Sequence, residues 1–350
     1  MKNEKTAEIL QSIAISFVSV VLSLLVGAII IIAMGYSPID AYKALIKGSI
    51  GSLTAMTITL KTSVPLILSG LAVAVAFRGS AFNIGVEGQL MVGALCSAIV
   101  GIYVPLPAGL HLAAALIAGI IGGMLFAFIP AILKSACNVS VVISTIMLNY
   151  VAQFTVQYLV MGPLHGKTSA AATDKILSTA IMPSLLPSPY QINLGLIIMI
   201  AAIIAVYICL NKTTYGYEMT AVGINPIASE FCGIDVKRNM FVALLISGSI
   251  AGLAGGIEVT GTLKRMVNGF SAGYGFSGIP IALMARNNPF AIIITGLFFA
   301  IMRSGSLLMQ ASVGVSSDLV GIIQGLVVIF ICLENLFRYY LNNRRKGDAK

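Results

Sequence analysis

The sequence predicts an all-α membrane protein, a polytopic bundle of about ten transmembrane helices, some of them broken or re-entrant. Hydrophobic residues make up 58% of the 350 residues and charged residues only 9%, whereas about a quarter of the residues in an ordinary soluble domain are charged. The charges are clustered, so that long stretches such as 88–133 and 176–211 hold none. About 20 apolar residues cross the hydrocarbon core of a bilayer, so several of these stretches can span it.

The length of each apolar run, together with the charges and helix breakers around it, predicts where each membrane segment lies. Segment 13–34 is longer than the apolar region of a removable signal peptide and has no small-residue cleavage site after it, so we expect it to remain as the first anchor. Two prolines within 103–109 divide a run that is too long for one crossing. Residues 276–285 are too short to span alone, which predicts a half-helix held inside the protein. The ten predicted segments are 13–34, 62–77, 86–103, 109–132, 139–161, 192–210, 239–259, 276–285, 289–309 and 318–337.

The distribution of basic residues predicts that both termini are cytoplasmic. The net charge is +9, and the basic residues lie mainly at the ends of hydrophobic segments, which argues against nucleic-acid binding. With both termini inside, most of the 21 lysine and arginine residues fall on the cytoplasmic side, as the positive-inside rule requires. This orientation puts the loop 162–191 outside and the polar loop 211–238 inside. We expect 1–338 to form a single transmembrane domain and 339–350 a basic cytoplasmic tail.

The sequence shows no pattern typical of an enzyme or a metal site. Its five cysteines are scattered without a CxxC spacing, and His111 and His165 lie in loop-like contexts without evident partners. Gly162–Thr168 is similar to a phosphate-binding loop, but it is one residue too short and no strand precedes it. We therefore expect no enzymatic activity, no metal ion and no cofactor in this chain.

Polar residues interrupt the hydrophobic sequence at two places. Arg78–Gln89 contains three glycines and several polar side chains, and a second glycine-rich stretch covers Asn268–Gly278. A charge at bilayer depth costs at least about 2.5–3.5 kcal/mol, so a carboxylate there usually faces a partner or a wet cavity. Glu87 fits this description best, because Glu258 and Asp318 are equally well explained as solvated segment ends. Paired interruptions are typical of broken helices that line a substrate path.

Segment 139–161 carries a polar stripe. Its side chains recur every four residues, which places them on one face of a helix. Uncharged amides on such a face can bind a polar solute, but they can equally well form hydrogen bonds between helices, and both interpretations remain open. The stripe consists of Thr145, Asn149, Gln153 and Gln157.

Glycine pairs at four-residue spacing predict close contacts between helices. Small residues at this spacing let two helix backbones approach each other. We interpret these pairs as packing positions rather than functional ones. They are Gly119 with Gly123, Gly248 with Gly252, Gly252 with Gly256, and Gly321 with Gly325.

The inner loop carries the pattern G…AVGxNxxAxxxxGI within Tyr215–Asp235, followed by the glycine-rich segment Ser247–Gly256. It resembles the cytoplasmic coupling segment of permeases in the branched-chain amino acid, ribose and simple-sugar group of bacterial ABC importers. The resemblance covers about residues 10–338. It implies a short helix whose small residues fit a cleft on a separate ATPase subunit and transmit its closure. The ATPase-coupling positions that it implies are Gly223, Asn225, Ala228 and Gly233.

The motif Phe82–Gln89 is similar to a signature of the simple-sugar and nucleoside branch of this group, whose external binding protein is a basic membrane lipoprotein. The resemblance implies a multi-pass permease subunit in the bacterial plasma membrane, which forms the translocation pathway for nucleosides such as guanosine. It further implies a second permease subunit, commonly different from the first, the external lipoprotein, and an ATPase subunit that binds Mg-ATP. The pathway or gate positions that it implies are Asn83, Glu87 and Gln89. From their spacing we add Asn149, Gln153 and Gln157 as pathway positions.

Other substrates and another transport class remain open. The chain could carry a simple sugar such as ribose, or branched-chain amino acids. An ion-coupled secondary transporter would use Glu87 as its coupling carboxylate, although the inner loop argues against this class. A channel is disfavoured, because the sequence shows no charged ring or filter motif.

Overall fold

The computed structural model describes residues 2–167, 169–327 and 329–330. This part of the chain is helical, with isolated two-residue bridges and no strand, which confirms the predicted all-α class. Two compact units divide the chain. The first consists of Met1–Met56 with Ile301–Lys350, and the second of Thr57–Ala300.

The first unit is built on a sharply bent helix pair. Helix α1 (Lys2–Ala33) is followed by α2 (Pro38–Ile50), and Val18–Ala33 makes an angle of 120° with α2. Ser37 caps α2 by accepting a hydrogen bond from the Asp40 backbone N–H at 3.4 Å, and Pro38 takes the first helical position. The sequence did not predict α2. The predicted segment 318–337 is a helix over Asp318–Val327, and 328, 331–337 and the tail 339–350 lie outside the described residues.

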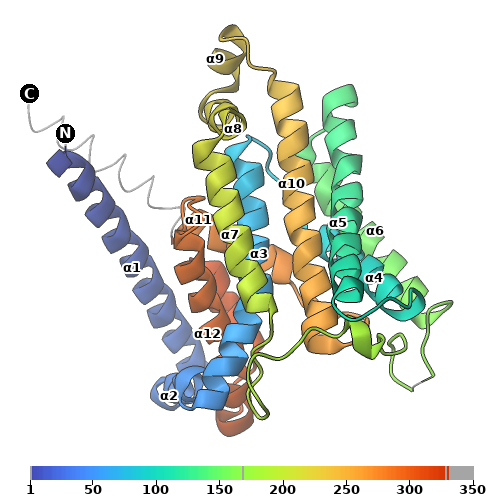
Figure 1. Cartoon of the computed structure of the whole chain (residues 1–350). Coiled ribbons are helices and arrows are strands. Elements are labelled where there is room, and N and C mark those ends of the chain that lie inside the picture. Colours follow the sequence, from blue (N-terminus) through green and yellow to red (C-terminus); the bar gives the residue numbers. More distant parts are fainter. Residues whose placement is uncertain (1, 168, 328, 331–350) are drawn as a thin grey trace, which may run out of the picture. The chain divides into compact units, whose positions relative to one another are not determined.

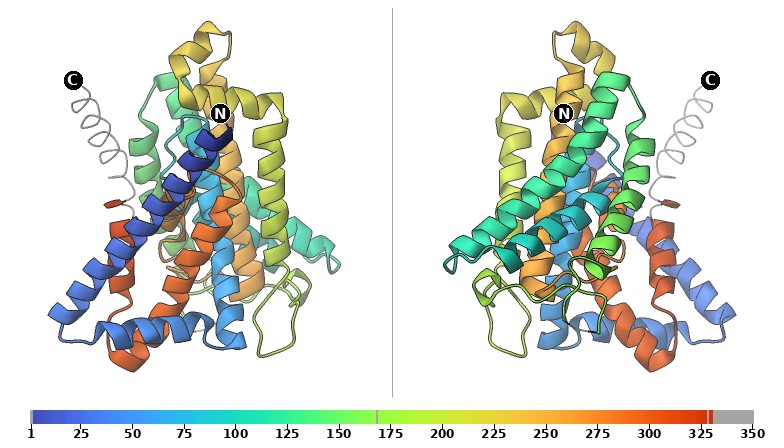
Figure 2. Two further views of the ribbon diagram at one scale, coloured as in Figure 1. Left: turned by 90° about the vertical axis from the view of Figure 1, so that its left-hand side faces the viewer. Right: turned by 90° about the vertical axis from the view of Figure 1, so that its right-hand side faces the viewer.

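The second unit contains most of the remaining helices. Helices α8 and α9 lie at one end of this unit, while η1, η2 and the loop between α6 and α7 lie at the other (Figures 1 and 2). Its elements are α3 (Leu53–Arg78, which begins in the first unit), α4 (Val86–Tyr103), α5 (Leu110–Cys137), α6 (Val141–Met161), η1 (Ser178–Ala180), α7 (Gly195–Lys212), α8 (Thr214–Ile224), α9 (Pro226–Phe231), α10 (Val236–Ile257), the π-helical η2 (Glu258–Leu263), α11 (Tyr274–Met284) and α12 (Ala291–Val313, which ends in the first unit).

Glycines hold α4, α5 and α10 together at the core of the second unit. These three helices pack more extensively against one another than any other helices do. A Cβ atom on Gly252 would lie 2.1 Å from the Gly119 carbonyl oxygen, and one on Gly123 would lie 2.3 Å from the Gly248 carbonyl oxygen. The close contacts predicted for these glycines are confirmed. The prediction is wrong for Gly321 and Gly325, where an added Cβ meets no described atom within 4 Å.

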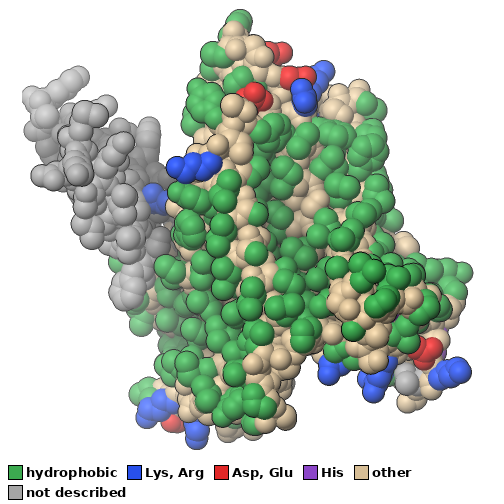
Figure 3. All heavy atoms as spheres, viewed as in Figure 1, with side chains coloured by type: hydrophobic (Ala, Val, Ile, Leu, Met, Phe, Trp, Pro, Cys, Tyr) green, Lys and Arg blue, Asp and Glu red, His purple; other side chains and the backbone are tan. Residues whose placement is uncertain are grey.

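The apolar helices suit a lipid environment. Among the described residues, six helices are long and apolar enough to cross a bilayer, and the bent pair raises the number to seven if it counts as one span. They are α3, α4, α5, α7, α10 continued by η2, and α12. Hydrophobic side chains cover the middle of the face of the second unit shown in Figure 3, and charged side chains gather over α8 and α9 at its end.

Two elements depart from ordinary membrane helices, and one of them was predicted. Helix α11 has only 11 residues, which confirms the prediction of a helix too short to span alone near 276–285. The π-helical η2, which ends α10, was not predicted. Both are the kind of irregular backbone that membrane proteins tolerate only where protein or a cavity surrounds it.

Candidate functional site

The two polar interruptions of the sequence meet at Glu87. This residue lies in the first turn of α4 and is only 4% exposed. Its Oε1 accepts hydrogen bonds from the Ser271 hydroxyl at 2.5 Å and the Gly273 backbone N–H at 3.2 Å, and its Oε2 accepts one from the Gly275 N–H at 2.6 Å. The last two donors lie at the start of α11, where the helix dipole favours a negative charge. Two of the three hydrogen bonds to this buried carboxyl group therefore come from the N-terminus of α11, and the third comes from the Ser271 side chain.

Glycine is required where α11 meets α4. A Cβ on Gly275 would lie 2.3 Å from the Glu87 backbone nitrogen, and Gly273 has a φ of +83°, which side chains rarely adopt. These glycines let the first turn of α11 come close enough for its N–H groups to reach the carboxylate. The glycine-rich stretch Asn268–Gly278, identified in the sequence, therefore forms the contact between α11 and the start of α4.

A pocket of about 470 Å³ opens beside this contact. Glu87 and Met91 of α4 form one wall, α6 forms a second, and residues 268–276 form the third. The lining combines uncharged amides with aromatic rings, and Glu87 is the only charged residue among the described residues that form it. The residues from α6 and from 268–276 are Asn149, Tyr150, Gln153, Val156, Gln157, Asn268, Gly269, Phe270, Ser271, Ala272, Gly273 and Phe276.

The polar stripe of α6 divides between two roles. Asn149 is 5% exposed, its Oδ1 accepts from the Gly88 N–H at 2.9 Å, and its Nδ2 donates to the Ile84 carbonyl at 2.9 Å. It joins α6 to the start of α4, although it also lines the pocket. Gln153 and Gln157 line the pocket and form no hydrogen bond to another helix within the described part of the chain, where Gln157 contacts the Met161 sulfur at 3.8 Å on its own helix. Thr145 is fully buried and bonds within α6.

Asn83 and Gln89 do not line this pocket. Both are buried, and their amides bond to each other: Asn83 Nδ2 donates to Gln89 Oε1 at 3.0 Å, and Gln89 Nε2 donates to Asn83 Oδ1 at 3.3 Å. Asn83 Nδ2 also donates to the Ser247 hydroxyl of α10 at 2.9 Å. This amide pair fixes the loop before α4 against α10. Its predicted place in the pathway stays a prediction.

The predicted coupling loop folds as two short helices joined by a tight turn. Thr213 caps α8 by accepting a hydrogen bond from the Gly216 N–H at 3.1 Å. Asn225 ends α8 and caps α9, since its Oδ1 accepts from the Ala228 N–H at 3.1 Å and Pro226 takes the first helical position. Gly233, with a φ of +83°, follows the end of α9. The motif residues therefore encode the shape of the segment.

Gly223 packs inside the protein. A Cβ there would lie 2.3 Å from the Arg78 carbonyl oxygen at the end of α3, so its small size serves the contact between α8 and α3. Burial raises the pKa of the nearby Tyr215 hydroxyl on α8 to about 12, because the ionised form would lose its hydration, and the positive charge of Arg238 opposes this shift. Tyr215 is therefore neutral at physiological pH.

The sequence analysis missed an exposed apolar surface on this segment. Ile224, Ile227 and Phe231, called the apolar tip below, are 82%, 70% and 89% exposed. The charged Glu230 and the polar Asn225 lie beside them in the sequence, and the segment lies beyond the end of the apolar spans (Figures 1 and 3). Exposed apolar residues with a polar rim typically mark a protein-protein contact. Their spacing at i, i+3 and i+7 was the signal that could have identified them.

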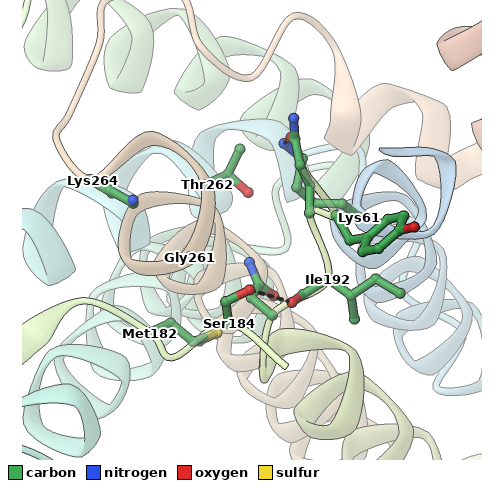
Figure 4. Close-up of a pocket in the computed structure, with 10 residues that line it drawn as sticks. Lys61, Met182, Ser184, Ile192, Gly261, Thr262 and Lys264 are labelled. Atoms are coloured by element: carbon green, nitrogen blue, oxygen red, sulfur yellow. Dashed lines mark hydrogen bonds between the residues drawn. The ribbon is translucent and has the colours of Figure 1, made fainter. Parts of the chain in front are cut away.

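A second, smaller pocket lies at the opposite end of the second unit. It has a volume of about 220 Å³, and Lys61 of α3 and Lys264, which follows η2, lie on opposite sides of it (Figure 4). The Lys61 ammonium group donates a hydrogen bond to Gln191 Oε1. The Ser184 hydroxyl, also in its lining, donates to the Ile192 carbonyl at 3.1 Å.

His111 has partners that the sequence did not reveal. It is fully buried, with Nδ1 2.7 Å from the Thr179 hydroxyl and Nε2 3.1 Å from the Val100 carbonyl oxygen. Because a carbonyl only accepts, Nε2 carries a proton and donates it to the Val100 carbonyl oxygen. The residue is a structural link between α5, α4 and η1. Within the described residues, no group of three or more His, Cys, Asp or Glu side chains could hold a metal ion.

The apolar helices, the broken α11 beside a polar pocket, and the exposed α8–α9 segment define a multi-pass membrane permease. The family described as "Branched-chain amino acid transport system / permease component" matches residues 55–332. The chain belongs to this family. It is an ABC transporter permease and a multi-pass protein of the plasma membrane, and its relatives are transport subunits that are not themselves catalytic.

Three curated relatives match nearly the whole chain. The guanosine ABC transporter permease protein NupP of Bacillus subtilis (strain 168) is 36% identical over 97% of this chain and 99% of its own length. The glucose ABC transporter permease protein TsgB13 of Haloferax volcanii is 34% identical over 95% and 91%. The nucleoside ABC transporter permease protein NupB of Lactococcus lactis subsp. cremoris is 33% identical over 97% and 94%.

Proposed function

We propose that this chain is the membrane-spanning permease subunit of an ATP-driven nucleoside importer, and that the 470 Å³ pocket is part of its translocation pathway. The pocket's chemistry carries the proposal. Side-chain amides of Asn149, Gln153, Gln157 and Asn268 can bond to base edges and ribose hydroxyls, and the rings of Tyr150, Phe270 and Phe276 offer apolar faces to a base. Pockets of about 300–1,000 Å³ hold small molecules of this size.

The same chemistry argues against a branched-chain amino acid. A zwitterion needs a partner for its ammonium group and another for its carboxylate. Among the described residues that line the pocket Glu87 is the only charged one, so the pocket offers no cation to pair with the substrate's carboxylate. A simple sugar fits amides and aromatic rings nearly as well as a nucleoside does. The two relatives named for guanosine and nucleosides support the nucleoside, while the relative named for glucose supports the sugar.

An ion-coupled transporter is also disfavoured. A coupling carboxylate must exchange its proton with water in each transport cycle. Glu87 is buried and its two oxygens accept three hydrogen bonds from residues 271–275, so it serves as an anchor for the start of α11.

We propose that the apolar tip contacts a separate ATPase subunit that binds Mg-ATP, so this chain needs no cofactor of its own. In this assembly a second permease subunit, different from this one, completes the pathway, and an external lipoprotein delivers the substrate. Gly223, Asn225, Ala228 and Gly233 are the ATPase-coupling positions. The exposed Ile224, Ile227 and Phe231 support this assignment, because nothing in the described chain covers them.

The proposed orientation follows from this contact. If α8 and α9 meet a cytoplasmic ATPase, the loop 211–238 is cytoplasmic and the loop 162–191, at the other end of the second unit, is external. Both termini are cytoplasmic when the chain crosses the membrane in about ten segments, with 1–338 acting as one permease domain and 339–350 as its tail.

Uptake measurements test the substrate and the energy source together. We expect vesicles that contain the chain, its partner permease, the ATPase and the lipoprotein to accumulate guanosine when ATP is present inside. Excess glucose should not compete. Accumulation of glucose instead of guanosine would establish the sugar alternative. Accumulation by this chain alone on a proton or sodium gradient would overturn the ABC mechanism.

Shortening Gln153 or Gln157 to alanine should weaken substrate use without changing the fold. Each amide lost from the pocket removes hydrogen bonds of about 0.5–1.5 kcal/mol, so we expect KM for uptake to rise about tenfold in the double variant. Thr155→Ala is the matched control, since Thr155 is exposed on α6 and does not line the pocket. An unchanged KM in the double variant would exclude these amides from the pathway.

Replacing Phe231 with serine should disrupt ATPase binding but not folding. The ring is 89% exposed, so its loss should change the free energy of unfolding by less than about 0.5 kcal/mol. Buried in an interface, an aromatic anchor contributes about 2 kcal/mol or more, so we expect the ATPase to co-purify at least about tenfold less efficiently. Leu186→Ser, in the loop 162–191, is the control and should leave co-purification unchanged.

A further inference from the structure

Helix α11 connects the α8–α9 segment to the pocket through a continuous series of contacts. We propose that α11 transmits movement of this segment to the pocket, and that Arg78 is the positioning residue that joins the two. The proposal rests on the proposed function, in which an ATPase acts on α8 and α9. All of the residues involved belong to the second unit.

The first contact joins α8 to the end of α3. A Cβ on Gly223 would lie 2.3 Å from the Arg78 carbonyl oxygen and 3.1 Å from its carbonyl carbon. The next residue, Gly79, is equally confined, since a Cβ there would lie 2.4 Å from the Ala243 Cβ of α10. Tightly packed interiors transmit displacement instead of absorbing it. A shift of α8 toward the membrane therefore moves the backbone at Arg78.

The second contact joins Arg78 to the C-terminal end of α11. Its Nε donates a hydrogen bond to the Asn287 carbonyl oxygen at 3.3 Å. Asn287 lies in the turn that follows α11, and its N–H bonds back to the Ala282 carbonyl of the helix at 2.9 Å. Arg286 and Asn287 have φ values of +51° and +56°. Two successive residues in this region store about 1–3 kcal/mol each and need surrounding contacts to hold them, and Arg78 supplies one.

The third contact joins the N-terminal end of α11 to the pocket. Glu87 holds the Gly273 and Gly275 N–H groups, while Ser271, Gly273 and Phe276 line the pocket. Between its two ends α11 runs closely along α3, where a Cβ on Gly278 would lie 2.7 Å from the Ser69 carbonyl oxygen. Helix α11 has 11 residues, is about 16 Å long and contains Pro280, which removes one backbone hydrogen bond from its middle but does not interrupt it. In this proposal, movement of the turn at Asn287 passes along α11 to the pocket wall.

This geometry gives Arg78 a role that neither substrate binding nor ATPase binding requires. It touches neither the pocket nor the apolar tip, and it acts through α11. Closure of the ATPase shifts α8, Arg78 carries the shift to the turn after α11, and the pocket wall at 271–276 moves relative to α6. The transport step then depends on Arg78, while docking and ATP hydrolysis do not.

The test uses the reconstituted complex with Arg78→Met, which keeps the length of the side chain but removes the donor. We expect unchanged ATPase co-purification and unchanged basal ATP hydrolysis, with guanosine transported per ATP hydrolysed reduced at least about tenfold. Arg78→Lys, which retains a donor, should restore part of the coupling. Lys134→Met is the matched control, because the Lys134 ammonium bonds to the nearby Asn138 side chain at the end of α5, and it should transport normally.

A spectroscopic measurement separates transmission from a general loss of structure. The chain contains no tryptophan, so Phe276→Trp with fluorinated tryptophan gives a single ¹⁹F resonance on the first turn of α11. We expect a non-hydrolysable ATP analogue to shift this resonance in the complex, and we expect no shift when Arg78→Met is added. Gly223→Ala should abolish the shift independently. A shift that persists in Arg78→Met, or normal transport per ATP, would overturn the proposal, whereas a complex that binds no ATPase would overturn the proposed function instead.

Discussion

Replacing Glu87 with glutamine is expected to lower the free energy of unfolding by about 3 kcal/mol and to reduce transport at least tenfold. The carboxylate accepts hydrogen bonds from Ser271, Gly273 and Gly275, and hydrogen bonds to a charged group are worth about 1.5–3 kcal/mol each. Glutamine keeps one acceptor oxygen but turns an NH₂ group toward a donor. Thermal unfolding in detergent and vesicle uptake measure the two effects.

The control for Glu87→Gln is Gln153→Ala, which alters the same pocket without breaking a contact between helices. It should leave the free energy of unfolding within about 0.5 kcal/mol of the original value. If Glu87 were a coupling carboxylate and not an anchor, Glu87→Gln would remove dependence on an ion gradient and leave stability unchanged. Full stability in Glu87→Gln would therefore contradict the interpretation from the structure.

The length of each apolar run, together with its helix breakers, predicted the ends of a helix correctly where glycine or proline ended that helix. Segment 86–103 has the same bounds as α4 (Val86–Tyr103), because Gly85 precedes it and the prolines after Tyr103 end it. The same method missed α2 and the first turns of α3. Lys43, Lys47 and Lys61 interrupt those apolar runs, yet lysine is compatible with a helix when its long stem reaches polar surroundings. Charges therefore marked the ends of apolar runs, but not the ends of helices.

The sequence predicted separate parts of the candidate site, but not how they come together. Composition identified both interruptions, but the hydrogen bond from Gly275 to Glu87 joins residues 188 apart in sequence, and no local pattern encodes such a contact. The α6 stripe shows a second limit. Residues four apart on a helix of 3.6 residues per turn rotate by about 40° per step, so Thr145 and Gln157 differ by about 120°. One end of the stripe is buried against α4, while the other faces the pocket.

Substituting alanine for Gly252 is expected to cost about 1–3 kcal/mol, because the core of the second unit leaves no room for a methyl group. The added Cβ would lie 2.1 Å from the Gly119 carbonyl oxygen and 3.0 Å from the Gly123 Cα. Both are backbone atoms, so α5 and α10 must separate, and overpacking of this kind typically costs about 1–3 kcal/mol, occasionally more. Alanine's higher helix propensity, worth about 1 kcal/mol, offsets only part of this cost.

Gly256→Ala on the same helix is the matched control. One turn further along α10, the atoms nearest to an added Cβ are Leu116 Cδ2 and Ser97 Oγ at 3.5 Å, which is ordinary contact. Gly321→Ala, where the Cβ meets no described atom within 4 Å, should stabilise its helix by up to about 1 kcal/mol. In thermal unfolding, the Tm of Gly252→Ala should therefore lie far below that of Gly256→Ala and that of Gly321→Ala. Equal stability of the three variants would show that glycine at 252 is not required for packing, since all three replace a helical glycine by the same methyl group.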